Sequence, residues 1–161
     1  GSGANTMSEN LGIPKHEAQR LLDDWYSPMP NVRKYFDEKI KIAFEQKIST
    51  TPFGRRRNFI LTPKNKFAVR NEALNTTIQG TASDLTLFSL VAIQKELTER
   101  NLGSVVLTVH DSVIAENLPE HTEAVAEVMV RHMREIPKKY LKTDVPFAAD
   151  VDVGELWGEL D

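Results

Sequence analysis

Hydrophobic residues recur along this chain at two periods, one typical of helices and one typical of strands. Large apolar residues three and four positions apart predict helices over residues 14–26, 30–47, 71–100 and 117–137. Runs rich in valine, isoleucine and threonine predict a hairpin over residues 104–116 and a last strand over residues 145–153. A further hairpin is predicted over residues 49–61, with Gly54 at its tip.

The longest predicted helix, over residues 71–100, is unusually polar in its first third. Its expected buried stripe consists of Leu74, Ile78, Ala82, Leu85, Phe88 and Ala92. Gly80 lies inside this helix, where glycine costs about 1 kcal/mol relative to alanine. We therefore expect another segment to approach the helix backbone at Gly80. Gly103 follows the helix as its expected C-terminal stop.

The predicted hairpin over residues 104–116 has a polar centre, His110-Asp111-Ser112. Two β-branched runs flank this centre without glycine or proline, so we expect two buried strands that meet in a tight turn. An aspartate on such a turn would be a rigid ligand for a metal ion or a substrate. Alternatively, His110 and Asp111 are only turn formers, because aspartate readily bonds its own backbone. The tripeptide alone slightly favours this second interpretation.

Composition limits the classes of protein to which the chain can belong. The 161 residues suffice for a domain with a core, and 40% of them are hydrophobic. No apolar run reaches the ~18 residues that a membrane span needs, so we expect no membrane partner. The absence of cysteine excludes disulfides and thiolate metal sites.

Charge is distributed unevenly, although the net charge of −3 argues against a strong polyanion binder. Residues 54–71 include six basic and no acidic residues, whereas residues 144–161 include six acidic and no basic ones. Such asymmetry suggests one face for phosphate and another for water or metal. A solvated surface would explain the same clusters, so charge alone leaves both interpretations open.

Four segments, in this order, resemble the C-terminal part of family A DNA polymerases. Thr51–Arg57 is similar to the family's Gly-Arg-Arg hairpin, and Asn75–Asp84 is similar to its Asn-x-x-x-Gln-Gly-Thr-Ala-Ala-Asp helix. Val109-His110-Asp111 stands where the family has the Val-His-Asp of its catalytic hairpin. Val145-Pro146, followed by Gly154–Trp157, is similar to the closing strand. The resemblance extends over nearly the whole chain from Ile13.

The resemblance implies an α+β fold, in which a long helix backs an antiparallel palm sheet. Residues 4–48 would form a helical segment on the fingers side, and residues 49–161 the palm. Residues 1–3, Gly-Ser-Gly, are expected to be a cloning remnant rather than part of the fold.

By the same resemblance, the parent protein would carry out template-directed DNA synthesis from dNTPs with two Mg²⁺ ions. Asp111 would be one of two metal-binding carboxylates, beside His110. The expected DNA contacts are Asn75, Gln79 and His110 as minor-groove donors, and Arg55, Arg56 and Arg70 as phosphate contacts. The implied partners are primer–template DNA, dNTPs and the N-terminal part of the polymerase. The implied location is the cytoplasm of a bacterial or phage-infected cell, or an organellar nucleoid.

Three departures from the family pattern keep alternatives open. Ser112 stands where the family usually has glutamate, and His-Asp-Ser resembles single-subunit RNA polymerases, which are the first alternative. Asn71 stands where the family helix usually has arginine, with Arg70 one position away. The strand with the second catalytic aspartate and most of the fingers helix lie upstream in the family, so we expect the chain alone to be inactive. A non-catalytic nucleic-acid-binding module is the second alternative, whereas four ordered motifs argue against a domain with no nucleic-acid role.

Overall fold

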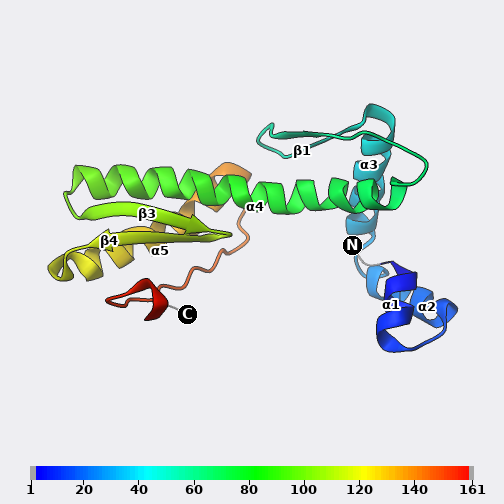
Figure 1. The fold of residues 1–161 in the computed structure, drawn as a ribbon, viewed down its shortest axis with the longest axis horizontal. Coiled ribbons are helices and arrows are strands. Elements are labelled where there is room, and N and C mark those ends of the chain that lie inside the picture. Colours follow the sequence, from blue (N-terminus) through cyan, green and yellow to red (C-terminus); the bar gives the residue numbers. More distant parts are fainter. Residues whose placement is uncertain (1–2, 160–161) are drawn as a thin grey trace. The chain divides into compact units, whose positions relative to one another are not determined.

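The computed structural model describes residues 3–159 (Figure 1). Its elements, in chain order, are α1 (Ala4–Leu11), α2 (Lys15–Tyr26), α3 (Pro30–Gln46), β1 (Ile48–Thr50), β2 (Arg56–Asn58), α4 (Lys66–Glu99), β3 (Gly103–Val109), β4 (Ser112–Asn117), the 3-10 helix η1 (Pro119–His121), α5 (Thr122–Leu141) and the 3-10 helix η2 (Trp157–Glu159). The chain divides between Thr81 and Ala82 into two compact units, and α4 contributes to both. Gly1 and Ser2 of the expected cloning remnant lie outside the described residues. The predicted boundary between residues 48 and 49 stays a prediction.

Two of the helices before the first hairpin, α2 and α3, begin and end close to where the sequence predicts. α2 starts directly after Pro14, and α3 has Pro30 in its first turn, where the missing N–H of proline costs nothing. α3 ends at Gln46, and Lys47 caps it in a left-handed conformation with φ 55°. The sequence did not predict α1, a short helix that ends at Gly12 with φ 64°.

The hairpin β1–β2 packs against the first half of α4. The hydroxyl of Ser49, which is buried, donates a hydrogen bond of 3.1 Å to the backbone carbonyl of Ala73. A Cβ at Gly80 would lie 2.8 Å from Cγ2 of Thr51, closer than side-chain contacts normally come. This confirms the expectation that a second segment approaches the α4 backbone at Gly80. Nearby, an apolar cluster consists of Ala43, Phe59, Val69 and Ala73.

The hairpin β3–β4 is the centre of the second unit, and runs alongside the C-terminal half of α4 (Figure 1). Its core consists of Ile93, Leu97, Leu102, Val125 and Val128, with Val105, Val113 and Ala115 of the hairpin packed against them. The strand register shifts between Val105 and Leu107, which is a β-bulge. The side-chain oxygen of Gln94 accepts a hydrogen bond of 2.8 Å from the backbone N–H of Val105, so α4 anchors β3 beside the bulge.

The prediction that both strands of this hairpin are buried is wrong. Val106, Leu107 and Val109 are 53%, 39% and 37% exposed. The sequence pattern is that of a strand covered on both faces, but within residues 3–159 the helices cover only one face of the two-stranded sheet.

The buried face of α4 also differs from the predicted apolar stripe, since Ile78 is 54% exposed and Ala82 is exposed as well. Thr77 and Ser89 are almost completely buried instead. Each hydroxyl donates to a backbone carbonyl one turn earlier in the helix, Thr77 to Ala73 and Ser89 to Leu85. Because these bonds remove the cost of burying a hydroxyl, polar residues can occupy the inner face and break the hydrophobic period.

Two predictions near the end of the chain are wrong. Pro137 does not end its helix: it lies buried inside α5, which continues to Leu141. The last strand, predicted over residues 145–153, is irregular. Its alternating valines fit a strand, but a strand forms only where its backbone pairs with a neighbour. Here Nη2 of Arg134 donates to the backbone carbonyl of Ala149 at 3.1 Å instead.

Two smaller expectations also change. The predicted helix start near residue 71 moves to Lys66. The residue in left-handed conformation after α4 is Asn101, with φ 52°. Gly103 is required for another reason: a Cβ there would collide with the carbonyl oxygen of Glu116. No helix within residues 3–159 combines the length and the apolar character needed to cross a bilayer.

Candidate catalytic turn and nucleic-acid surface

The turn between β3 and β4 contains His110 and Asp111, because Val109 and Ser112 form the last pair of the ladder. His110 adopts a left-handed conformation with φ 55°. The Ser112 hydroxyl donates to the backbone carbonyl of Val109 at 2.8 Å, and the Thr108 hydroxyl donates to the carbonyl of Ser112 at 2.8 Å. The side chains of Thr108 and Ser112 thus stabilise the turn through hydrogen bonds to its own backbone.

Asp111 is exposed at the tip of this turn. Within residues 3–159 its carboxylate makes no hydrogen bond or ion pair, which leaves both oxygens open to a ligand. Carboxylate oxygens suit Mg²⁺, which is usually held by one or two carboxylates together with phosphates. The same part of the chain contains no cluster of three or more His, Cys, Asp or Glu that could hold a metal ion. Asp111 therefore fits as one ligand of such an ion, and the described residues do not complete the site.

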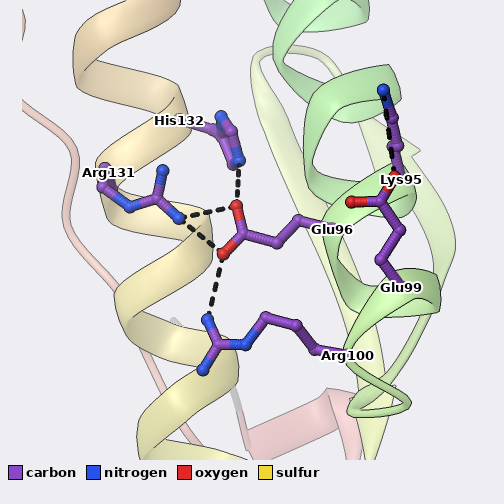
Figure 2. A network of polar contacts seen from close by, with 6 residues as sticks. All are labelled: Lys95, Glu96, Glu99, Arg100, Arg131 and His132. Carbon is purple, nitrogen blue, oxygen red and sulfur yellow. Dashed lines mark hydrogen bonds and ion pairs between the residues drawn. The ribbon is translucent and has the colours of Figure 1, made fainter.

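An ionic cluster joins α4 to α5, the two helices that pack against the hairpin (Figure 2). Both carboxylate oxygens of Glu96 accept from Nη2 of Arg131, at 2.7 and 2.6 Å. Arg100 Nη1 lies 2.9 Å from one of these oxygens, and His132 Nε2 lies 2.8 Å from the other. The hydrogen bond from Arg131 is the main reason that the pKa of Glu96 is lowered to about 2. The cluster joins the two helices that support β3 and β4.

In the first unit, Asn75 and Gln79 are both exposed on α4, one turn apart. The residue between them, Thr77, is buried, so the two amides lie on the outer face of the helix. Amide N–H groups can donate to the acceptors that A·T and G·C pairs share in the minor groove. Both predicted donors therefore lie where a ligand can reach them.

The three arginines that are predicted to contact phosphate differ in their exposure to solvent. Arg55 and Arg56 are exposed on the β1–β2 hairpin, whereas Arg70 is half-buried, with its guanidinium 3.5 Å from the side-chain oxygen of Asn71. The loop before Arg55 is fixed by the Thr51 N–H, which donates to the Arg55 carbonyl at 2.9 Å. Gly54 in this loop has φ 89°, which favours glycine.

Sequence reasoning did not single out Arg57, whose Nη2 donates to Oε2 of Glu72 on α4 at 2.8 Å. The signal available in the sequence was the alternation of strand side chains, which places Arg57 and Arg56 on opposite faces of β2. Five predicted site residues belong to the first unit: Arg55, Arg56, Arg70, Asn75 and Gln79. His110 and Asp111 belong to the second.

The chain is similar to bacterial and animal DNA polymerases over nearly its whole length. The family model described as DNA polymerase family A matches residues 1–159. A DNA polymerase I of Chloroflexus aurantiacus is 30% identical over 164 residues, which cover 99% of this chain and 17% of the relative. A thermostable DNA polymerase I of Thermus aquaticus is 30% identical, covering 98% of this chain and 19% of the relative. DNA polymerase theta of Caenorhabditis elegans is 31% identical, and the match covers 99% of this chain and 10% of the relative. The chain thus spans less than a fifth of the length of these relatives.

A solved structure supports the fold. The POL domain of Pol1 from M. smegmatis, in complex with DNA primer-template and dNTP, matches with a TM-score of 0.76 and 22% identity. The match covers 83% of this chain and 24% of that one. The helices and antiparallel hairpins described above, together with this match, confirm the α+β class. The family model favours the DNA polymerases over the RNA polymerase alternative. From its four ordered motifs and a family match over residues 1–159, we conclude that the chain belongs to DNA polymerase family A.

Proposed function

We propose that this chain is the C-terminal palm and fingers-side part of a template-directed DNA polymerase that adds nucleotides from dNTPs to a primer. The observation that supports this most directly is Asp111, an exposed carboxylate without a partner among residues 3–159, at the tip of a turn that two hydroxyls close. Its position in the Val-His-Asp motif of a family A chain makes it the candidate catalytic residue. Such a protein would work where DNA is copied, in the cytoplasm or in a nucleoid.

Asp111 would serve as one carboxylate ligand of the Mg²⁺ ions, which, when bound, neutralise charge on the triphosphate. The two hydroxyl hydrogen bonds of the turn fix the backbone from which this carboxylate extends. His110, which is exposed next to Asp111 in the turn, would donate to a minor-groove acceptor.

Asn75 and Gln79 would donate to minor-groove acceptors, and Arg55 and Arg56 would bind phosphates, so a duplex would be held independently of its sequence. Arg70 is the weaker phosphate candidate, because it is half-buried and turned toward Asn71. The relative from M. smegmatis was solved with primer-template and dNTP, which are the ligands that we propose here.

Binding of a labelled primer–template duplex by the 161-residue chain tests this surface. We expect binding that weakens with salt, and a several-fold loss of affinity in Gln79→Ala. Gln19→Ala is the matched control, because Gln19 is an exposed amide on α2 of the same unit and bonds only Asp23, at 3.2 Å. Absence of binding at low salt, or equal affinity of both variants, would refute the proposed surface.

We also propose that the chain alone does not extend a primer, because its described residues supply one carboxylate at the turn. In the whole polymerase that contains this chain, Asp111→Asn should abolish primer extension without weakening duplex binding. A non-catalytic binding module remains a second candidate because Ser112 replaces the usual glutamate and its hydroxyl closes the turn. That candidate predicts that the whole protein binds duplex but extends no primer even with Asp111 intact.

A further inference from the structure

We propose that Arg57 is an additional phosphate-contacting residue of the duplex-binding surface, and that Glu72 positions it. This inference rests on the proposed function, since it concerns the same nucleic-acid surface. Its ligand is the phosphodiester backbone of duplex DNA, which an arginine recognises without reading sequence.

The register of the first hairpin directs Arg57 toward α4. Arg57 pairs with Ser49, whereas Arg56 pairs with the exposed Thr50. Ser49 is buried against α4, and side chains of directly paired residues lie on the same face of a sheet. Arg57 therefore extends from the inner face of the hairpin, and Arg56 from the outer one.

Two contacts hold the guanidinium of Arg57. Its Nη2 donates to Oε2 of Glu72 at 2.8 Å, and its Cζ lies 5.8 Å from the centre of the Phe59 ring. Phe59 is buried and directly follows β2, two residues after Arg57, so the ring is a fixed support. The Arg57 side chain is nevertheless 51% exposed. Only Nη2 is used in the ion pair, and a guanidinium has five N–H donors, so donors remain for a phosphate.

The partner of Arg57 belongs to the same helical row as the proposed groove donors. Glu72, Asn75 and Gln79 follow one another on α4 at spacings of three and four residues, which places them on one face. Glu72 is therefore a negatively charged residue in a row that would face the negatively charged DNA backbone. Arg57 offsets the charge of this acid, and the N–H donors that the ion pair leaves unused lie beside the row.

An exposed ion pair of this kind contributes little to folding stability. Its greater effect would be on binding, because an arginine that is already ordered loses less conformational freedom when it contacts a phosphate. Glu72 is in this view a positioning residue that acts through Arg57.

The test measures the affinity of the 161-residue chain for a labelled primer–template duplex between 50 and 300 mM salt. We expect Arg57→Ala to weaken binding about eightfold at 0.1 M salt and to reduce the slope of log K against log salt by about 0.9, the effect of one lost phosphate contact. Lys41→Ala is the charge-matched control: Lys41 is exposed on α3, where it lies 3.9 Å from Glu45, and we expect less than a twofold change. Arg57→Lys should recover part of the slope.

Glu72→Gln separates positioning from plain charge repulsion. If Glu72 positions Arg57, this substitution weakens binding when Arg57 is present and strengthens it in the Arg57→Ala background, where only the negative charge is lost. Equal strengthening in both backgrounds would overturn the positioning role. Unchanged affinity and slope in Arg57→Ala, while Gln79→Ala still weakens binding, would overturn the inference alone. Failure of the unaltered chain to bind would overturn the proposed duplex surface together with it.

Discussion

Replacement of Glu96 by glutamine should destabilise the second unit in a manner that depends on pH. Glu96 accepts two hydrogen bonds from Arg131 and one each from Arg100 and His132, across the α4–α5 interface (Figure 2). Glutamine has nearly the same shape but no charge, so Glu96→Gln removes the ionic part of the contacts with Arg131 and Arg100. Among the side chains that the structure describes, the carboxyl group of Glu96 has the most strongly lowered pKa.

The size of the effect follows from the pKa of Glu96, which is 4.5 without perturbation and about 2 in the folded chain. Each pKa unit corresponds to about 1.4 kcal/mol, so the difference sets an upper limit of about 3 kcal/mol. Solvent reduces this, because the Arg131 and Arg100 side chains are 36% and 45% exposed. We therefore expect Glu96→Gln to lower the free energy of unfolding by about 1–2 kcal/mol at pH 7.

The direction of the pH dependence is fixed by the lowered pKa. Because the folded chain holds a charged Glu96 more strongly than the unfolded chain does, the stabilisation is complete above the unfolded pKa of 4.5. It is lost progressively as the pH falls from 4.5 to about 2. The difference in stability between the unaltered chain and Glu96→Gln should accordingly be constant near neutral pH and disappear at the acid end.

Urea unfolding followed by circular dichroism, at a series of pH values from 7 to 2, measures this difference. Glu99→Gln is the matched control, because it makes the same chemical change less than one turn further along α4. Glu99 lies 3.9 Å from Lys95, and both side chains are more than 60% exposed, so we expect an effect near zero. Equal effects of the two substitutions, or a difference that persists at pH 2, would refute the reasoning.

Two further substitutions test contacts that support the proposed sites. Gly80→Ala would stabilise an exposed helix by about 1 kcal/mol, but here the new Cβ would lie 2.8 Å from Cγ2 of Thr51, so we expect destabilisation by about 1–3 kcal/mol in urea unfolding. Thr51→Ser removes that methyl group and should recover stability, whereas a Gly80→Ala chain at least as stable as the parent would contradict the packing. Gln94→Ala removes the acceptor of the Val105 N–H and should cost about 1–2 kcal/mol. Amide hydrogen exchange at Val105 should become faster, and unchanged protection would exclude this anchor.

The parts of the fold that the sequence predicts well are those with local signals. Pro14 and Pro30 mark the beginnings of α2 and α3, and Gly54 marks the first hairpin turn, because each restricts or frees its own backbone. The turn at His110 and Asp111 was also predicted, since two β-branched runs leave only the polar centre to turn. Boundaries and buried faces were less predictable. Thr77 can be buried because its hydroxyl bonds within the helix, which no hydrophobic pattern can indicate.

The residues of the candidate site also divide into those with a local signal in the sequence and those without one. Asp111 and Gln79 were found through motifs that are contiguous in sequence. The pair of Arg57 and Glu72 spans 15 residues and exists only because β2 packs beside α4. A run of three arginines predicts a cationic hairpin, but it does not say which arginine turns inward or what it meets there. That information comes from the strand register, and the register depends on the tertiary contact made by Ser49.

Three sets of contacts, each further from Asp111 than the one before, determine its position. The hydroxyls of Thr108 and Ser112 fix the turn itself, and they are within three residues of the aspartate. Gln94 fixes β3 at the bulge, and the ionic cluster around Glu96 fixes the helices on which the hairpin rests. The outer face of β3 contributes nothing comparable within residues 3–159, since its valines are exposed there. The contacts that fix the position of Asp111 are therefore polar and lie on the side of the hairpin that faces the helices. Substitutions at Gln94 and Glu96 should accordingly displace Asp111 more than substitutions at exposed β3 residues would.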